Sequence, residues 1–264
     1  MMRIRCLSAL VLSCGLLLPA ANAGAANLIY QGGPVVRVAK VVYIFWGPSF
    51  ANPASPDSVY AQFLQLFRNN FGTTGEYNVI TQYYQISGGV KQFIQLSNLA
   101  AGTADWFDTS SPPLNVTDAA AQAEVRRYLA SHAADASTIY EVFLPSTSYS
   151  SNGGGTSCGG PSLAYCAYHG VLGGIATPAG LYSVQPYASC SACQVAGWTA
   201  YQNQERLVAF TTRSSVVNPH FNSWYDPTGI DGESKCFGSP PFLDGGFGYP
   251  LDWSNAAGKC VKTR

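Results

Sequence analysis

The cysteines constrain the fold of this chain more than any other feature. Eight occur in the sequence, and two of them, Cys6 and Cys14, fall within the first 23 residues. The other six lie between positions 158 and 260, and an even set in an exported chain predicts structural disulfides rather than free thiols. These six are Cys158, Cys166, Cys190, Cys193, Cys236 and Cys260.

The first 23 residues predict that the chain is exported. A short basic start precedes an apolar run over residues 6–18, and Ala21-Asn22-Ala23 has the pattern of a signal-peptide cleavage site. The apolar run is shorter than the roughly 20 residues that span a bilayer. We therefore expect a signal peptide over residues 1–23 and a single secreted domain over residues 24–264, extracellular or periplasmic, with no membrane partner.

The pairing of the cysteines is not determined by their spacing, because six cysteines permit many combinations. Short intervening loops favour Cys158 with Cys166 and Cys236 with Cys260. Cys190 and Cys193 have the spacing of half a zinc knuckle, but no second C-x-x-C follows to complete one. Disulfides are therefore favoured over a zinc site at this pair.

The charge composition excludes two classes of partner. The sequence holds 14 Lys and Arg against 14 Asp and Glu, and only 11% of its residues are charged. Such a chain lacks the basic field that binds nucleic acid or anionic membranes, so neither is expected as a partner. Aromatic residues make up 13%. This content suits a protein that meets wall or matrix polysaccharide, and a disulfide-stabilised core explains it equally well.

Apolar periodicity predicts helices mixed with strands. The predicted strands cover residues 35–46, 90–96, 138–144, 163–172 and 181–187, and the predicted helices cover residues 58–71, 119–133 and 202–215. This order predicts an α/β or α+β fold, with a mixed sheet flanked by helices. Residues 146–160 are nearly all Ser, Thr, Tyr, Asn and Gly, which predicts an exposed loop. The chain after Pro219 is expected to be coil held by cysteines.

Several short blocks then follow one another in a recognisable order. They are Tyr30-Gln-Gly-Gly-Pro-Val35, Tyr43-Ile-Phe-Trp-Gly47, residues 77–83, residues 138–145, residues 157–169 and Trp224-Tyr225-Asp226. Together they resemble the EXORDIUM-like (phosphate-induced protein 1) family of secreted proteins over most of residues 30–236. The resemblance implies a zinc-peptidase-like scaffold in which a late helix carries the metal ligands.

The metal motif of that family is missing from this chain. Many microbial members read approximately S-H-E-L-x-E, then a proline, then W-Y-D. Placing Pro219 on that proline and Trp224-Tyr225-Asp226 on W-Y-D sets Phe210, Thr211 and Ser214 at the positions of the His, Glu and second Glu. None of the three can do the work of a zinc peptidase, and neither H-E-x-x-H nor H-E-x-x-E occurs elsewhere. The resemblance therefore implies a degenerate peptidase-like site without a metal cofactor. The expected role is binding or signalling at a cell wall or matrix, with a polysaccharide or protein ligand in the cleft over the degenerate helix.

An alternative interpretation is a secreted hydrolase that acts on a polymer or peptide, with zinc rebuilt around His169, Asp226 and Glu233, or without metal. His169 matches a family histidine and could act as ligand or acid–base group, although a single histidine in an apolar strand is commonly a hydrogen-bonded core residue. Asp226 precedes Pro227 and also suits a turn. Whether the protein is an enzyme stays open, with a binding protein favoured.

Two further arrangements of candidate residues belong to the hydrolase alternative. Asp231 and Glu233 are a pair of carboxylates of the kind that cleaves glycosides, although acids in loops are usually solvated. Ser157 lies in Gly-Thr-Ser-Cys-Gly, which fits the letters of the G-x-S-x-G nucleophile motif. That motif requires a strand before the serine and a helix after it, and the sequence predicts neither.

Overall fold

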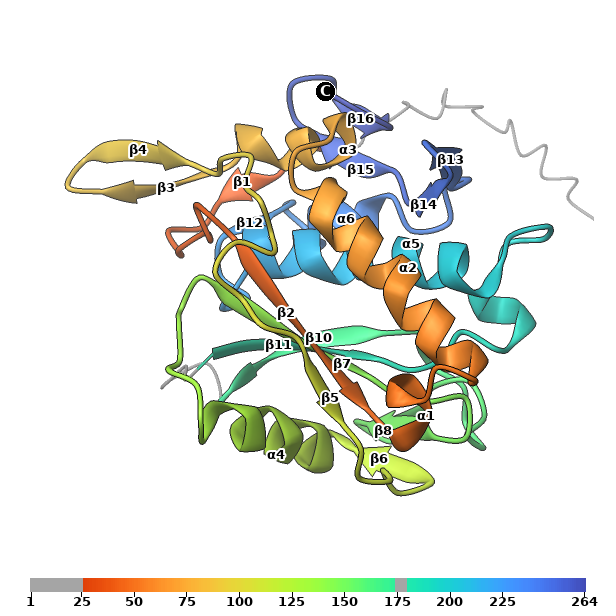
Figure 1. Ribbon diagram of the computed structural model, residues 1–264. Helices are drawn as coiled ribbons and strands as arrows, with labels where there is room; N and C mark the ends of the chain where they lie inside the picture. The colour runs from red at the N-terminus through yellow and green to blue at the C-terminus, as the bar shows by residue number, and fades with distance from the viewer. Residues whose placement is uncertain (1–25, 174–179) are drawn as a thin grey trace, which may run out of the picture.

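A five-stranded mixed sheet forms the centre of the molecule in the computed structural model, which describes residues 26–173 and 180–264 (Figure 1). The predicted signal peptide lies outside these ranges. The strand order is β10-β11-β7-β2-β5, and only β10 runs antiparallel to its neighbour. The strands are β2 Lys40–Trp46, β5 Trp106–Asp108, β7 Thr138–Phe143, β10 Tyr168–Leu172 and β11 Gly180–Gln185.

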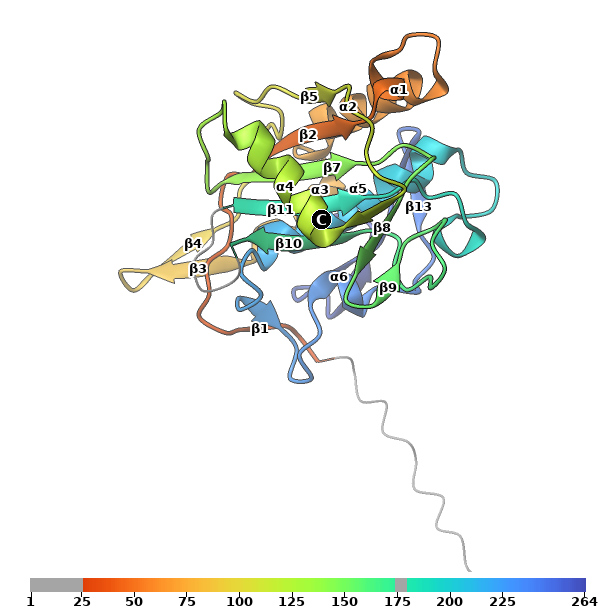
Figure 2. The same cartoon turned by 90° about the horizontal axis from the view of Figure 1, so that it is seen from below.

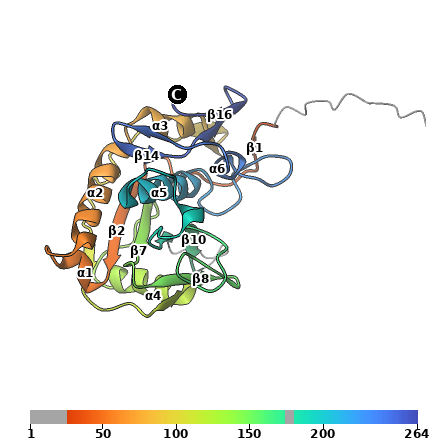
Figure 3. The same cartoon turned by 90° about the vertical axis from the view of Figure 1, so that its right-hand side faces the viewer.

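Helices cover both faces of this sheet, which confirms the predicted mixed sheet flanked by helices. On one face lies α4 (Asp118–Leu129), and on the other lie α2 (Pro56–Phe71) and α5 (Ala200–Val217) (Figure 3). Because side chains alternate along a strand, β2 sends Val42, Ile44 and Trp46 toward α4, and it sends Val41, Tyr43 and Phe45 toward α5. The result is one apolar core on each side of the sheet.

Each long helix follows a residue whose side chain accepts a hydrogen bond from one of its free backbone N–H groups. Ser55 and Thr117 accept hydrogen bonds from the first turns of α2 and α4. At the start of α5, Thr199 and Gln202 form a reciprocal capping box. These local signals fix where the three helices start, and α5 starts two residues before the predicted position. No helix of the described residues is long and apolar enough to span a membrane.

The remaining elements are short and surround the central sheet. A hairpin of β3 (Tyr84–Ser87) and β4 (Val90–Phe93) projects from the body (Figure 1). Figure 2 shows α4 across one face of the sheet with β8 and β9 nearby. The other short elements are β1 Ile29–Tyr30, α1 Pro48–Ala51, α3 Gly75–Asn78, η1 Val79–Gln82, β6 Asn115–Thr117, β8 Tyr149–Asn152, β9 Gly155–Thr156, η2 Ser191–Cys193, β12 Trp224–Tyr225, α6 Gly232–Lys235, β13 Phe242–Asp244, β14 Phe247–Tyr249, β15 Asp252–Ser254 and β16 Lys259–Val261.

The prediction of an exposed loop over residues 146–160 is wrong. This segment forms β8 and β9, and Ser150 and Ser157 are completely buried within it. The reason is tertiary, because β8 pairs in parallel with β6, which lies more than 30 positions earlier in the chain. Composition reports local preference, and the long-range pairing overrides it here.

Two other element predictions need correction. Only residues 168–172 of the predicted strand 163–172 form β10, and residues 163–167 line a pocket instead. The chain after Pro219 is not plain coil, since it forms α6 and two hairpins, β13–β14 and β15–β16. These elements are stabilised by packing, and Tyr249 and Trp253 from them belong to the core on the α5 side of the sheet.

All six cysteines of the described residues form disulfides. Cys236 pairs with Cys260, as predicted, with their Cα atoms 5.7 Å apart. The predicted Cys158–Cys166 pair is wrong, and the bonds join Cys158 to Cys190 and Cys166 to Cys193. The turn η2 brings the two later cysteines opposite the two earlier ones, so spatial neighbours replace sequence neighbours.

Candidate functional site

A pocket of about 620 Å³ opens beside the middle of α5. Leu207 and Phe210 of this helix line it, and further walls come from the segments at residues 163–167, 192–195 and 236–241. Phe237 on its lining is 81% exposed, which is unusual for a phenylalanine side chain. The volume falls within the range of about 300–1,000 Å³ that is typical of small-molecule sites.

Two of the three disulfides form part of the pocket wall. Cys166 and Cys193 are bonded to each other and both line the pocket, and Cys236 lines it from the opposite segment. Cys236 is in turn bonded to Cys260 of β16. Cross-links therefore hold the irregular segments that surround the pocket.

Arg206 is the cationic residue among those that line the pocket. Its Nη2 donates a hydrogen bond to the Cys193 carbonyl oxygen at 2.9 Å. Its Nε is buried and has no hydrogen-bond partner, and no carboxylate of the described residues lies within ion-pair distance. Burial lowers the pKa of Arg206, although a guanidinium stays protonated in proteins.

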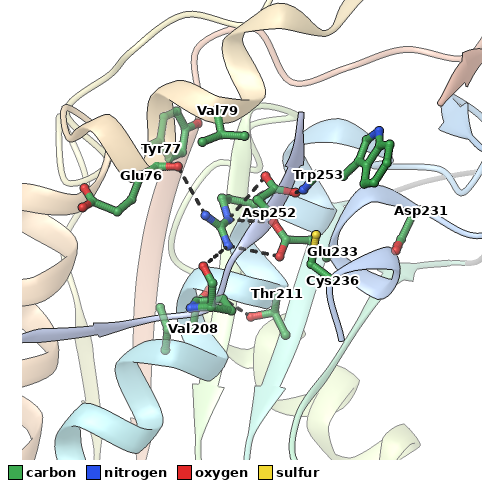
Figure 4. Close-up of polar contacts among 12 residues, drawn as sticks. Glu76, Tyr77, Val79, Val208, Thr211, Asp231, Glu233, Cys236, Asp252 and Trp253 are labelled. Atoms are coloured by element: carbon green, nitrogen blue, oxygen red, sulfur yellow. Dashed lines mark hydrogen bonds and ion pairs between the residues drawn. The ribbon is translucent and has the colours of Figure 1, made fainter. Parts of the chain in front are cut away.

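Glu233 also lines the pocket, but its charge is directed into the protein. Its Oε1 lies 2.6 Å from Nε of the fully buried Arg213, and its Oε2 accepts from Nη2 at 3.1 Å (Figure 4). Asp252 approaches the same guanidinium at 3.7 Å. Burial raises the pKa of Glu233, the Arg213 guanidinium opposes this, and Asp252 adds to it. The hydrogen-bonded pair leaves Glu233 as part of the structure rather than as a free general acid.

The three positions of the missing metal motif lie on different sides of α5. Phe210 lines the pocket, whereas Thr211 and Ser214 are buried inside the protein. Thr211 Oγ1 accepts from Gln185 Nε2 at 2.7 Å and donates to the Leu207 carbonyl oxygen at 3.1 Å. Of the three, only the phenylalanine side chain can meet a ligand in the pocket.

His169 lies on β10, paired in register with Ser183 of β11. Its ring stacks on Phe221 with 5.0 Å between the ring centroids. Burial lowers the pKa of His169 to about 4, so the imidazole is neutral at pH 7. His169 does not line the pocket beside α5.

Asp226 closes a turn and holds an ion pair. Its Oδ2 lies 2.7 Å from Lys235 Nζ, and its Oδ1 accepts hydrogen bonds from the Thr228 hydroxyl and the Ile230 N–H. The lysine and the threonine hold the pKa of Asp226 well below its ordinary value. These contacts match the turn interpretation of this residue.

The residues of the other two hydrolase interpretations, Ser157 and the pair Asp231 and Glu233, also make structural hydrogen bonds or ion pairs. Ser157 is completely buried and accepts a hydrogen bond from the Ser150 N–H at 2.9 Å, so its hydroxyl does not face a pocket or a histidine. Asp231 caps α6 by accepting from the Ser234 N–H at 2.7 Å. Glu233, its partner in the glycosidase interpretation, is held by Arg213.

The structure does not bring His169, Asp226 and Glu233 together as a set of metal ligands. In the described ranges, the one group of three potential ligand atoms within mutual reach is that of Cys158, Cys190 and Cys193. All three sulfurs belong to disulfides, which removes the thiolates that would bind a metal.

A row of polar side chains crosses the sheet beneath α5, with three of its members completely buried and His169 half-buried, and the sequence patterns did not reveal it. Tyr43, Glu141, Ser183 and His169 are in register on four neighbouring strands. Thr212 of α5 donates a hydrogen bond to Glu141 Oε1 at 2.8 Å. Burial raises the pKa of Glu141 to about 8. The signal that could have revealed this row is the single acid inside the apolar strand TIYEVF.

Comparison with known proteins adds no relative. No protein-family model, curated protein or solved structure matches this chain. The resemblance to the EXORDIUM-like family therefore stays a prediction that depends on the sequence blocks given above. The geometry of the pocket is the independent basis for a functional proposal.

Proposed function

We propose that this protein is an extracellular binding protein that acts at a cell wall or matrix and holds an apolar part of its ligand in the pocket beside α5. One observation carries this proposal. Phe210 lines the pocket at the position where the family resemblance places a zinc-binding histidine. On a zinc-peptidase-like scaffold, an apolar surface would thus replace the catalytic one while the cleft is kept.

The chemistry of the pocket favours binding over catalysis. Leu207, Phe210 and Phe237 provide apolar surface, whose removal from water contributes roughly 25 cal/mol per Å². The carboxylate at the pocket, Glu233, is ion-paired with Arg213. Three disulfides are typical of proteins from oxidising compartments, which supports an extracellular or periplasmic location.

Replacing Phe210 with asparagine should weaken the binding of a neutral apolar dye, N-phenyl-1-naphthylamine, on the order of tenfold. The asparagine removes aromatic surface from the pocket and adds an amide that the dye cannot satisfy. Phe237→Ser should weaken binding several-fold, because this ring lies at the exposed side of the pocket. The measurement is a fluorescence titration of the purified protein.

Val90→Ser is the matched control, because Val90 is 63% exposed but lies on the projecting β3–β4 hairpin. It should leave the dye affinity unchanged, as should His169→Ala. Equal affinities for the wild type and both phenylalanine variants would contradict the proposal. Turnover of a peptide or polysaccharide that His169→Ala abolishes in a folded protein would instead support the hydrolase alternative.

A further inference from the structure

We infer that the pocket beside α5 takes an amphipathic carboxylate, with its apolar body against Leu207 and Phe210 and its carboxylate on the guanidinium of Arg206. This inference rests on the proposed function, since it names the ligand class of the same pocket. It adds a specific charge requirement that a purely apolar site would not have.

Arg206 is half-buried and has no counter-charge among the described residues, unlike the two buried arginines, Arg68 and Arg213. Arg37 also lacks an ion pair with any described residue, but of Arg37 and Arg206 only Arg206 lines the pocket. Arg68 forms an ion pair with Asp105, and Arg213 forms one with Glu233. Arg206 has only the Cys193 carbonyl oxygen as a hydrogen-bond acceptor, through Nη2, which leaves its buried Nε without a partner. A guanidinium without a counter-ion among the described residues therefore lines the pocket.

A carboxylate would supply what this guanidinium lacks. Taking a charge out of water without a partner is unfavourable, and the planar guanidinium matches a carboxylate through parallel N–H···O bonds. The contact with the Cys193 carbonyl oxygen already holds the side chain, so little further ordering is needed on binding. A ligand anion is therefore favoured over a neutral head group.

The second charged group at the pocket does not oppose this assignment. Both carboxylate oxygens of Glu233 contact Arg213, whose side chain is completely buried. Of the two charged residues that line the pocket, Arg206 is therefore the one without an ion-pair partner among the described residues. The remaining lining is largely apolar and includes Pro240, Pro241 and Leu251, which suits an alkyl chain or aromatic ring better than a sugar with many hydroxyl groups.

The test compares octanoate with 1-octanol, which share an alkyl chain but differ in charge. Binding of each is measured by calorimetric titration of the protein that comprises residues 24–264. The wild type should bind octanoate at least tenfold more tightly than octanol, and this preference should weaken at high salt. Arg206→Met should remove the preference, because it should lower the affinity for octanoate at least tenfold and leave the affinity for octanol unchanged. Arg126→Met is the matched control, because Arg126 is exposed on α4, and it should change neither affinity.

The outcomes separate this inference from the proposed function. Equal wild-type affinities for octanoate and octanol, both weakened by Phe210→Asn, would overturn the carboxylate assignment and leave the binding pocket in place. Affinities that Phe210→Asn does not change would overturn both. The comparison of the two ligands on the wild type needs no variant, so the inference stays testable even where Arg206→Met fails to fold.

Discussion

Replacing Arg213 with methionine is expected to lower the free energy of unfolding by about 3–5 kcal/mol. The substitution leaves Glu233 and Asp252 buried without their shared cation, and it removes the donor to the carbonyl oxygens of Glu76 and Pro250. The side chain of Arg213 is completely buried, so water cannot replace these contacts. Urea denaturation followed by circular dichroism measures the change.

A surface ion pair provides the control for this prediction. Lys40 and Asp135 lie 3.0 Å apart with side chains 36% and 40% exposed, so Lys40→Met should cost only about 0.2–1 kcal/mol. Adding Glu233→Gln and Asp252→Asn to Arg213→Met should recover part of the lost stability, because the uncompensated charges are then removed. A loss for Arg213→Met no larger than that for Lys40→Met would show that the buried cluster is energetically neutral.

Replacing Glu141 with glutamine is expected to change the pH dependence of stability. Burial raises the pKa of Glu141 from 4.5 to about 8. Between these two values the folded protein holds a proton that the unfolded chain has released, so wild-type stability falls as the pH rises. Glutamine carries no such proton, so the stability of the variant relative to the wild type should increase by up to about 1.4 kcal/mol per pH unit from about pH 5 to pH 8.

Urea denaturation at intervals from pH 5 to pH 9 tests this expectation. The amide oxygen of Gln can still accept from Thr212, so the hydrogen bond that holds Glu141 is kept. Asp135→Asn is the control, because hydrogen bonds from Ser137, together with Lys40, lower the pKa of Asp135 to about 2. Its stability difference from the wild type should stay constant above pH 5. A constant difference for Glu141→Gln would show that this carboxyl group ionises normally.

Much of the central architecture follows from local sequence patterns. The strand at residues 138–143 and the helix that starts at Pro56 were predicted because apolar periodicity and capping residues act over short distances. The strands β8 and β9 were missed because β8 is held by pairing with the distant β6, and β9 in turn pairs with β8. One of the two predicted cysteine pairs, Cys158 with Cys166, was wrong because it was chosen by closeness in sequence. In the fold, η2 brings Cys190 and Cys193 near partners that lie 32 and 27 residues away.

The candidate site was only partly accessible from sequence. Alignment of the W-Y-D block pointed to Phe210, which does line the pocket. No local pattern distinguishes Arg206 from Arg213 on the same helix, because one meets a pocket and the other a buried carboxylate only after the C-terminal elements have packed. Their different environments are a property of tertiary structure.

The disulfides in the pocket wall also link ligand affinity to thiol chemistry. Until Cys166 has joined Cys193 and Cys236 has joined Cys260, the segments around the pocket lack the cross-links that fix their spacing. A reduced chain would therefore bind weakly even with its central sheet formed. By thermodynamic reciprocity, any ligand that prefers the oxidised form also protects those two bonds against reductants. Occupancy of the proposed binding pocket would then shift the thiol–disulfide equilibrium of those two bonds toward the disulfide.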